Sequence, residues 1–375
     1  MHKRAFLKTL GAAAAALAVQ PGDALAALAP QPRRTKNFVW MRPDLKKTAD
    51  DWKREFARMR ESGIDGINPE IYNGSSALYS SRRFPVRSPW LDTALPLARA
   101  AGLEVHAWMW TMPCLLPEIV KGHPDWYNVN AKGENASTKP AYVDYYKFMD
   151  PARTEVREFI RETVRELAAI SGLTGIHLDY VRHPDAILPS GLWSKYGIVQ
   201  DKVYPPYDYG YTDDSRAQFK AKTGVDPITL ADPEANAAWL QYRLDTVVDL
   251  VNDYLVPAAH AGGKQITAAV FPGPGRAKTM VRQDWGRFRL DGFFPMLYHS
   301  FYDAGPEFVK TYTEEAVRTV KAPVYSGLYI PSLKDDEFER AIRMALEGGA
   351  AGVSIFDLGA MTPARWTLVK RVLGA

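Results

Sequence analysis

Cysteine is almost absent from this sequence, since Cys114 is the only one in 375 residues. A single thiol excludes an internal disulfide, and its neighbours Pro113 and Leu115 are more typical of a small packed side chain than of a nucleophile. Long apolar runs are also missing after the N-terminus, because no stretch approaches the roughly 18 apolar residues that span a bilayer. The sequence therefore predicts no membrane partner for the mature chain.

A surplus of charge of one sign is missing too. The formal net charge is +4 and the basic residues do not gather in one segment, which argues against a nucleic-acid partner. Hydrophobic residues make up 46% of the chain, so a large core can form and extensive disorder is excluded. Aromatic residues are numerous, with 10 Trp and 19 Tyr. Most of these rings are expected in the core, but rings outside it can stack on the apolar faces of sugars.

The N-terminus has the features of an export signal over residues 1–29. Lys3 and Arg4 form a charged region, Leu10–Val19 is a short apolar segment, and Ala24–Ala26 or Ala27–Ala29 supplies a cleavage site. The charged region resembles a twin-arginine signal in which Lys replaces the first arginine. No cysteine lies near the cleavage site, which argues against a lipid anchor. We therefore expect a periplasmic or extracellular protein.

Beyond a Pro- and Arg-rich linker at residues 30–36, strand-like segments alternate with helical ones. Most of the strand-like segments are short apolar or aromatic runs bounded by Gly, Pro or charge, which is typical of strands buried on both faces. Eight such segments, each followed by a helical segment or loop, predict a single (β/α)8 TIM barrel over residues 37–375. The predicted strands are Phe38–Arg42, Gly66–Ile71, Glu104–Trp110, Gly175–Tyr180, Gln265–Phe271, Gly292–Tyr298, Val324–Tyr329 and Gly352–Phe356.

The intervening segments have helical periodicity. Asp50–Ser62 places Trp52, Phe56 and Met59 on one face, as an amphipathic helix does. An open doubly wound sheet would normally carry a glycine-rich nucleotide loop after its first strand, but Met41–Asp44 contains no glycine. The other predicted helices are Pro151–Ile170, Asn236–Ala261, Pro306–Val320, Asp335–Glu347 and Pro363–Leu373.

Two connections, after the third and fourth strands, are unusually long. They run over residues 111–150 and from 182 to about 233, and long structured loops in a compact domain are usually functional. Both leave the catalytic face of the predicted barrel, so we expect them to wall a cleft. The second connection is dense in rings, and we expect Tyr207, Tyr209 or Tyr211 to reach that cleft.

The segment Gly175–Pro184 is the most informative in the chain. An apolar run ends in Asp179 and is followed by Arg182 and by Pro184, whose ring cannot continue a strand. A carboxylate at the C-terminal end of a buried strand is where barrel enzymes keep their catalytic acids. The alternative is that Asp179 only pairs with Arg182 to close a loop.

The sequence lacks the residues that other reactions on a barrel fold require. The chain has 7 His and none form a pair at a strand end, so no metal site is predicted, and His106 and His177 are expected to be buried core residues. A phosphate site is disfavoured because Gly327 and Gly359 are isolated in the last two strand-to-helix segments. No predicted strand contains a lysine for Schiff-base chemistry, and no nucleophile elbow is present. We predict no cofactor.

Carboxylates and rings remain at the predicted barrel mouth, and these are the groups that glycoside hydrolysis needs. Asp179 is the first predicted catalytic carboxylate, and Arg182 is an orienting cation. For the second carboxylate we favour Asp303, which follows a polar and aromatic strand end, with Glu70 and Asp357 as alternatives. Glu70 has a competing role as a partner of Arg42, and Asp357 as a cap of the last helix or loop. The predicted substrate-binding residues are Arg42, Glu70, Tyr72, Trp108, Trp110, His183, Tyr298, His299, Tyr329 and Asp357.

The segment Gly175–Pro184 also resembles the Gly-Ile-His-x-Asp-Tyr-x-Arg-Tyr-Pro signature of glycosyl-hydrolase-like family ten, with His183 in place of the second tyrosine. The resemblance covers most of the chain from about Phe38 onward. It implies a barrel with a carbohydrate-active role, such as that of exported bacterial hydrolases of cell-wall glycan. The other similar blocks are His123–Trp126 with Ala131–Gly133, Asp150-Pro151 with Val156–Ile160, and Pro295–Tyr298.

Together these features predict an exported glycoside hydrolase that cleaves a polysaccharide or oligosaccharide and retains the anomeric configuration. The main alternative is a catalytically silent carbohydrate-binding barrel, which would keep the aromatic mouth but lack a second carboxylate near Asp179. A phosphate-handling metabolic barrel is a weaker alternative because of the export signal.

Overall fold

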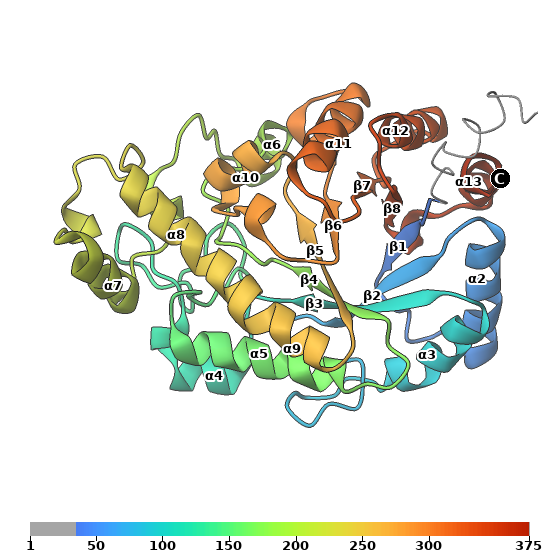
Figure 1. The fold of residues 1–375 in the computed structure, drawn as a ribbon, viewed down its shortest axis with the longest axis horizontal. Helices are drawn as coiled ribbons and strands as arrows, with labels where there is room; N and C mark the ends of the chain where they lie inside the picture. Colours follow the sequence, from blue (N-terminus) through green and yellow to red (C-terminus); the bar gives the residue numbers. More distant parts are fainter. Residues whose placement is uncertain (1–34, 375) are drawn as a thin grey trace, which may run out of the picture. The chain divides into compact units, whose positions relative to one another are not determined.

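The computed structural model describes residues 35–374, so the predicted signal peptide and most of the predicted linker lie outside the described residues. Eight strands form one parallel sheet in the order β6-β5-β4-β3-β2-β1-β8-β7. Helices alternate with the strands along the chain and lie around the sheet (Figure 1). The predicted (β/α)8 TIM barrel is therefore confirmed.

The barrel is closed between β6 (Gly292–Pro295) and β7 (Tyr325–Tyr329) by two isolated parallel bridges rather than by a full ladder. The backbone N–H of Phe293 donates to the carbonyl of Pro323, and that of Leu297 donates to the carbonyl of Gly327, both at 2.9 Å. These bonds occupy the two edges that an open sheet would leave free.

The strands lie close to their predicted positions. The largest difference is at the end of β6, because the chain leaves the strand at Pro295 and forms a short 3-10 helix at His299–Tyr302. The other strands are β1 (Phe38–Met41), β2 (Gly66–Tyr72), β3 (Glu104–Trp110), β4 (Gly175–Asp179), β5 (Gln265–Val270) and β8 (Gly352–Phe356).

The helices follow from local sequence in the same way. Thr48 and Asp51 form a capping box at the start of α2 (Ala49–Glu61), whose buried face carries Trp52, Phe56 and Met59 as predicted. The predicted helix 236–261 is α8 (Ala237–Asp249), a π-helical segment and α9 (Val256–Ala261). No helix within residues 35–374 is long and apolar enough to cross a membrane. The remaining helices are α3 (Trp90–Ala100), α4 (Pro117–Gly122), α5 (Thr154–Ala168), α6 (Trp193–Tyr196), α7 (Asp213–Thr223), α10 (Pro274–Val281), α11 (Glu307–Thr319), α12 (Asp335–Glu347) and α13 (Pro363–Leu373).

The barrel interior is filled by rings. Phe38, Trp40, Trp108, Phe294 and Tyr325 belong to one buried cluster, with edge-to-face contacts such as the 5.1 Å between the centroids of Phe38 and Phe294. Glycine supplies the space these rings need. A Cβ at Gly327 would lie 2.9 Å from Cη2 of Trp40 and 2.8 Å from the carbonyl oxygen of Pro295.

The two predicted core histidines are buried within this interior. Nε2 of His177 accepts a hydrogen bond from the indole N–H of Trp40 at 2.9 Å, and its Nδ1 lies 2.9 Å from the hydroxyl of Thr267. Burial holds the pKa of His177 well below its usual value, so the ring is neutral and Nδ1 carries the proton. Nε2 of His106 lies 3.6 Å from the carboxylate of Glu104.

The long connection after β4 is anchored by a buried ion cluster. The carboxylate of Asp208 accepts hydrogen bonds from Arg243 and Arg282, and both arginines also contact Glu234. Burial alone would raise the pKa of Asp208, but the charges of the two arginines hold it below its usual value. The cluster ties the connection to α8 and to the residue after α10.

We expect Gly327→Ala to lower the free energy of unfolding by about 1–3 kcal/mol, because the added methyl group overpacks the barrel against Trp40 and a backbone carbonyl. The matched control is Gly275→Ala in α10, where an added Cβ meets nothing within 4 Å. Urea unfolding of both variants measures the difference, and equal stability of the two would contradict the packing argument.

Candidate active site

A cavity of about 340 Å³ opens at the C-terminal ends of the strands, at the small end of the range for small-molecule sites. Both long connections contribute to its wall, as predicted: Tyr145 and Tyr146 come from the first, and residues from Asp185 to Tyr196 come from the second. The strand ends contribute Trp40, Arg42, Trp108, Asp179, Ala269, Met296, Tyr298, Tyr329 and Phe356.

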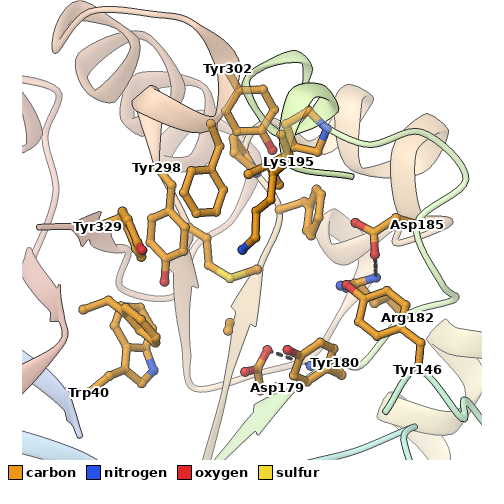
Figure 2. A pocket seen from close by; sticks show the side chains of 18 of the residues that line it. Trp40, Tyr146, Asp179, Tyr180, Arg182, Asp185, Lys195, Tyr298, Tyr302 and Tyr329 are labelled. Atoms are coloured by element: carbon orange, nitrogen blue, oxygen red, sulfur yellow. Dashed lines mark hydrogen bonds and ion pairs between the residues drawn. The ribbon is translucent and has the colours of Figure 1, made fainter. Parts of the chain in front are cut away.

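Asp179 lies at the floor of this cavity, at the last position of β4 (Figure 2). Its Oδ1 accepts a hydrogen bond from the backbone N–H of Tyr180 at 2.8 Å, and its Oδ2 accepts one from the indole N–H of Trp108 at 3.1 Å. Burial raises the pKa of Asp179, against the opposing effects of these donors and of the positive charges of Arg182 and Arg42. The carboxylate is thus oriented by two donors in a water-poor position.

The residue after Asp179 has an uncommon backbone conformation. Tyr180 has φ of 53°, in the left-handed region that a bulky residue rarely occupies. This turn directs its N–H to the Asp179 carboxylate, and the Tyr180 ring packs against Trp110 with centroids 5.1 Å apart. Such strain is common where a functional group must be held in one orientation.

Arg182 does not use Asp179 as its ion-pair partner. Its guanidinium binds the carboxylate of Asp185 at 2.8 Å, and both side chains are buried. The rings of Phe148, Tyr180 and Phe271 surround it, with centroids 5.0–5.5 Å from the guanidinium carbon. The alternative in which Asp179 only closes a loop with Arg182 is therefore not what the structure shows.

A second carboxylate, Glu70 of β2, is influenced by the charge of Asp179. Oε2 of Glu70 lies 3.3 Å from Nε of Arg42 and accepts a hydrogen bond from the indole N–H of Trp110 at 3.1 Å. Burial raises the pKa of Glu70, and the negative charge of Asp179 raises it further, while Arg42 and Trp110 oppose the shift. Arg42 also lies 3.8 Å from Asp357, so it stands between two carboxylates.

Rings form most of the remaining wall. Tyr298, Tyr329 and Phe356 pack against one another, with centroid distances of 5.3–5.8 Å. Arg42 extends over the rings of Trp108 and Phe356, at 5.3 and 5.5 Å from the centroids. Figure 2 shows Trp40, Tyr298 and Tyr329 together on one side of the cavity, facing Arg182 and Tyr146 on the other.

The structure brings only part of the predicted site into the cavity. Arg42, Trp108, Asp179, Arg182, Tyr298 and Tyr329 line it. Glu70, Trp110 and Asp357 do not line the cavity, but each contacts a residue that does. Glu70 and Asp357 contact Arg42, and Trp110 contacts Tyr180 as well as Glu70.

Tyr72, His183 and His299 lie elsewhere. A register shift between Glu70 and Tyr72 pairs Tyr72 with Met109, so its ring turns out of the barrel and stacks on Phe84 at 4.3 Å. His183 is buried against Asn128, 3.0 Å away, and burial together with the charges of two arginines lowers its pKa to about 3. His299 contacts Glu337 of α12 at 2.9 Å. The expectation that these three bind substrate in the cavity is not supported.

Asp303 is an exposed residue of the loop after β6 and is not among the residues that line the cavity. Its backbone turns through a φ of 51°, and its carboxylate accepts a hydrogen bond from the hydroxyl of Ser190 at 2.8 Å. This bond ties the loop after β6 to the long connection after β4, at a distance from the floor.

The tyrosine cluster of the second long connection does not reach the cavity either. Tyr209 and Tyr211 are buried, and Tyr211 packs against Trp239 of α8 with centroids 5.2 Å apart. Tyr207 stacks on Tyr142 of the first long connection with centroids 4.6 Å apart. The expectation for Tyr207, Tyr209 or Tyr211 is therefore wrong, because these residues contact α8 and the first long connection instead. The lining part of the connection is the earlier segment from Asp185 to Tyr196.

Sequence reasoning missed several lining residues: Tyr145, Tyr146, Asp185, Lys195, Phe301 and Tyr302. One of them had a readable signal, since Asp185 follows Arg182 at the i, i+3 spacing of an ion pair. The others lie in loops or in helical segments of only four residues, which are too short to show a periodic pattern. Within residues 35–374, no group of three or more His, Cys, Asp or Glu side chains is arranged to hold a metal ion.

No family model and no curated protein sequence matches the chain. Among solved structures, the PgaB (BpsB) glycoside hydrolase domain from Bordetella bronchiseptica aligns with a TM-score of 0.65 at 13% identity, covering 89% of this chain and 98% of that one. The catalytic domain of β-amylase from Paenibacillus polymyxa aligns with a TM-score of 0.63 at 14% identity, covering 91% and 98%.

A GH42 β-galactosidase from G. stearothermophilus aligns with a TM-score of 0.60 at 14% identity, and the match covers 92% of this chain and 56% of that enzyme. At these identities the likeness establishes a shared barrel fold. The resemblance of Gly175–Pro184 to glycosyl-hydrolase-like family ten continues to rest on the residues themselves.

The raised pKa of Asp179 predicts a pH-dependent effect of Asp179→Asn on stability. Ionised Asp179 destabilises the folded chain; this contribution is absent below its ordinary pKa of about 3.9, grows as the pH rises through the raised folded value, and then stays constant. We expect Asp179→Asn to gain stability relative to the wild type between pH 4 and pH 7, as measured by urea unfolding.

The matched control has the opposite sign. Hydrogen bonds and charge from Arg216 lower the pKa of Asp226, so the stability that Asp226→Asn loses relative to the wild type develops as the pH rises to about 4 and stays constant between pH 4 and pH 7. A parallel response of the two variants would contradict the assignment of a raised pKa to Asp179.

Proposed function

We propose that this chain is a glycoside hydrolase that cleaves a polysaccharide or oligosaccharide. The observation that carries the proposal is the position of Asp179, oriented by two N–H donors at the floor of a ring-walled cavity at the C-terminal mouth of the barrel. The fold shared with a glycoside hydrolase domain, a β-amylase and a β-galactosidase supports it. The signal-like N-terminus supports action on a glycan outside the cytoplasm.

In this proposal Asp179 is the nucleophile and Glu70 is the acid and base. An oxygen of Asp179 bonds to the anomeric carbon while the glycosidic C–O bond breaks and the leaving oxygen takes the proton of Glu70. Glu70 then takes a proton from water, whose oxygen attacks the same carbon and releases Asp179. Burial raises the pKa of both carboxyl groups. The two N–H donors and the charges of Arg182 and Arg42 favour the ionised form of Asp179, and the raised pKa of Glu70 favours a protonated acid.

Glu70 fits the second role better than the other carboxylates near the cavity. Glu70 contacts Arg42, which lines the cavity, and burial together with the nearby charge of Asp179 raises its pKa, as a catalytic acid requires. Asp185 lines the cavity, but its carboxylate is the partner of buried Arg182. Asp303 is exposed and bound to Ser190, which argues against the predicted catalytic role of Asp303.

The remaining lining residues have roles in binding. Tyr298 and Tyr329 offer rings on which a sugar can stack, while buried Trp108 orients Asp179 through its indole N–H. Arg42, held between Glu70 and Asp357, is exposed over half of its side chain and can donate to sugar hydroxyls. Arg182 lends positive charge near Asp179 through its fixed position against Asp185.

A panel of bacterial and plant glycans, digested with the mature protein, tests the activity. With an active substrate in hand, we expect Asp179→Asn and Glu70→Gln each to lower kcat by about a hundred- to ten-thousandfold, because each removes one carboxyl group from the reaction. Asp303→Asn should keep most of the activity. If Asp303→Asn lost turnover and Glu70→Gln kept near-normal turnover, Asp303 and not Glu70 would be the acid and base.

Binding without cleavage is the competing outcome. If the wild-type protein binds oligosaccharides from the panel but releases no product, the barrel is a carbohydrate-binding protein and the proposed hydrolysis is wrong. Circular dichroism and thermal melting of each variant separate lost chemistry from lost folding.

We further expect retention of the anomeric configuration. Direct attack needs two carboxyl groups about 5–5.5 Å apart, whereas a separation of about 6.5–9.5 Å leaves room for a water and inversion. Glu70 of β2 and Asp179 of β4 project from strands at one barrel mouth, and on this ground we expect the shorter separation. NMR of the first-formed product gives the answer, and an inverted anomer would make Asp179 a general base instead of a nucleophile.

A further inference from the structure

One cation of the cavity has no carboxylate partner. Lys195 of the short helix α6 lines the cavity, and Figure 2 shows its side chain reaching into it with the ammonium group directed toward the floor. Its ammonium group lies over the ring of Tyr196, whose centroid is 5.6 Å from Nζ. Within residues 35–374, no carboxylate lies at ion-pair distance from this ammonium group.

The other two cations that line the cavity are neutralised by the protein itself. Arg182 is bound to Asp185, and Arg42 lies between Glu70 and Asp357. The cations that act on Asp179 are Arg182 and Arg42, so Asp179 already has its positive neighbours. Lys195 therefore adds a positive charge to the cavity that neither the fold nor the catalytic carboxylate uses.

A bound sugar would cover this charge. Removing an ammonium group from water is costly unless an anion or several acceptors replace the lost hydration. Lys195 itself is exposed, and the two carboxylates that line the cavity are engaged elsewhere: Asp185 binds Arg182, and Asp179 accepts from its two N–H donors. A sugar that covers Lys195 would therefore have to bring the compensating negative charge itself.

We propose that the substrate is an acidic glycan and that Lys195 binds the anionic group on the sugar ring beside α6. This inference rests on the proposed function, because it takes the cavity to be a sugar site. A carboxylate and a sulfate present the same chemistry to a compact ammonium group, which recognises charge rather than planar shape. Lys195 would determine specificity without taking part in bond cleavage at Asp179.

Binding measurements on the mature protein test this without relying on turnover. The parent is the Asp179→Asn variant, which keeps the cavity but cannot cleave by the proposed mechanism. The probes are a hexuronic acid oligosaccharide, its carboxyl-reduced neutral counterpart, and a sulfated neutral oligosaccharide, each measured by calorimetry at low and moderate salt.

We expect the parent to bind at least one acidic probe more tightly than the neutral one. Adding Lys195→Gln to the parent should raise the Kd for that acidic probe by about tenfold or more, because a charge-assisted hydrogen bond is lost. Affinity for the neutral probe should change little, and the salt dependence of acidic binding should decrease. The matched control is Lys202→Gln, since Lys202 belongs to the same connection and lies over a tyrosine ring, but does not line the cavity.

The outcomes separate this inference from the proposed hydrolysis. Equal affinity of the parent for acidic and neutral probes, or unchanged acidic binding in Lys195→Gln, would overturn the role of Lys195, as would failure of every acidic probe to bind. Cleavage of neutral glycans alone by the wild type would uphold the hydrolase and reject the acidic substrate. If an acidic probe binds in a Lys195-dependent way but the wild type never cleaves it, the role of Lys195 is upheld and the proposed hydrolysis is rejected.

Discussion

The site depends on the cost of placing the Asp179 carboxylate at the end of a barrel filled with rings. Below it, Trp40, Trp108 and Phe294 leave no room for water, so burial raises the pKa of Asp179. Within residues 35–374, two hydrogen-bond donors reach the carboxylate, the Trp108 indole and the Tyr180 backbone N–H. Each requires a particular local structure: an inward tryptophan on the neighbouring strand, and a left-handed turn directly after the aspartate.

The cations around Asp179 are arranged so that they influence its charge without bonding to it. Arg182 is held by Asp185 and three rings, and Arg42 is held by Glu70 and Asp357. A direct ion pair would lower the pKa of Asp179 further and occupy the oxygen that must meet a substrate. Because each arginine has its own carboxylate, the floor keeps an accessible, reactive group, and Lys195 remains the lining cation free to meet a ligand.

Strand periodicity explains which parts of the site the sequence could predict. Inward positions alternate along a strand, so the strands and the placement of Asp179, Trp108 and Arg42 followed from apolar runs and from where they end. The prediction for Tyr72 relied on this alternation and was wrong, because a one-residue register shift between Glu70 and Tyr72 turns the Tyr72 side chain to the other face of the sheet. Residues beyond the strand ends, such as Asp303, have no period, and their direction depends on tertiary contacts such as the Ser190 bond.

The second long connection shows how a loop can be rigid and still shape a site. Rings of its ring-dense segment pack against the first long connection at Tyr142 and against α8 at Trp239. The buried cluster of Asp208, Arg243 and Arg282 binds the same segment to α8 and to the end of α10. Buried charges of this kind contribute more to fixing one arrangement than to net stability when every member is paired. The anchored segment leaves the preceding stretch, from Asp185 to Tyr196, in a fixed position over the barrel mouth. Specificity can therefore be set by residues of this stretch, such as Lys195, while the reacting carboxylates stay on the strands.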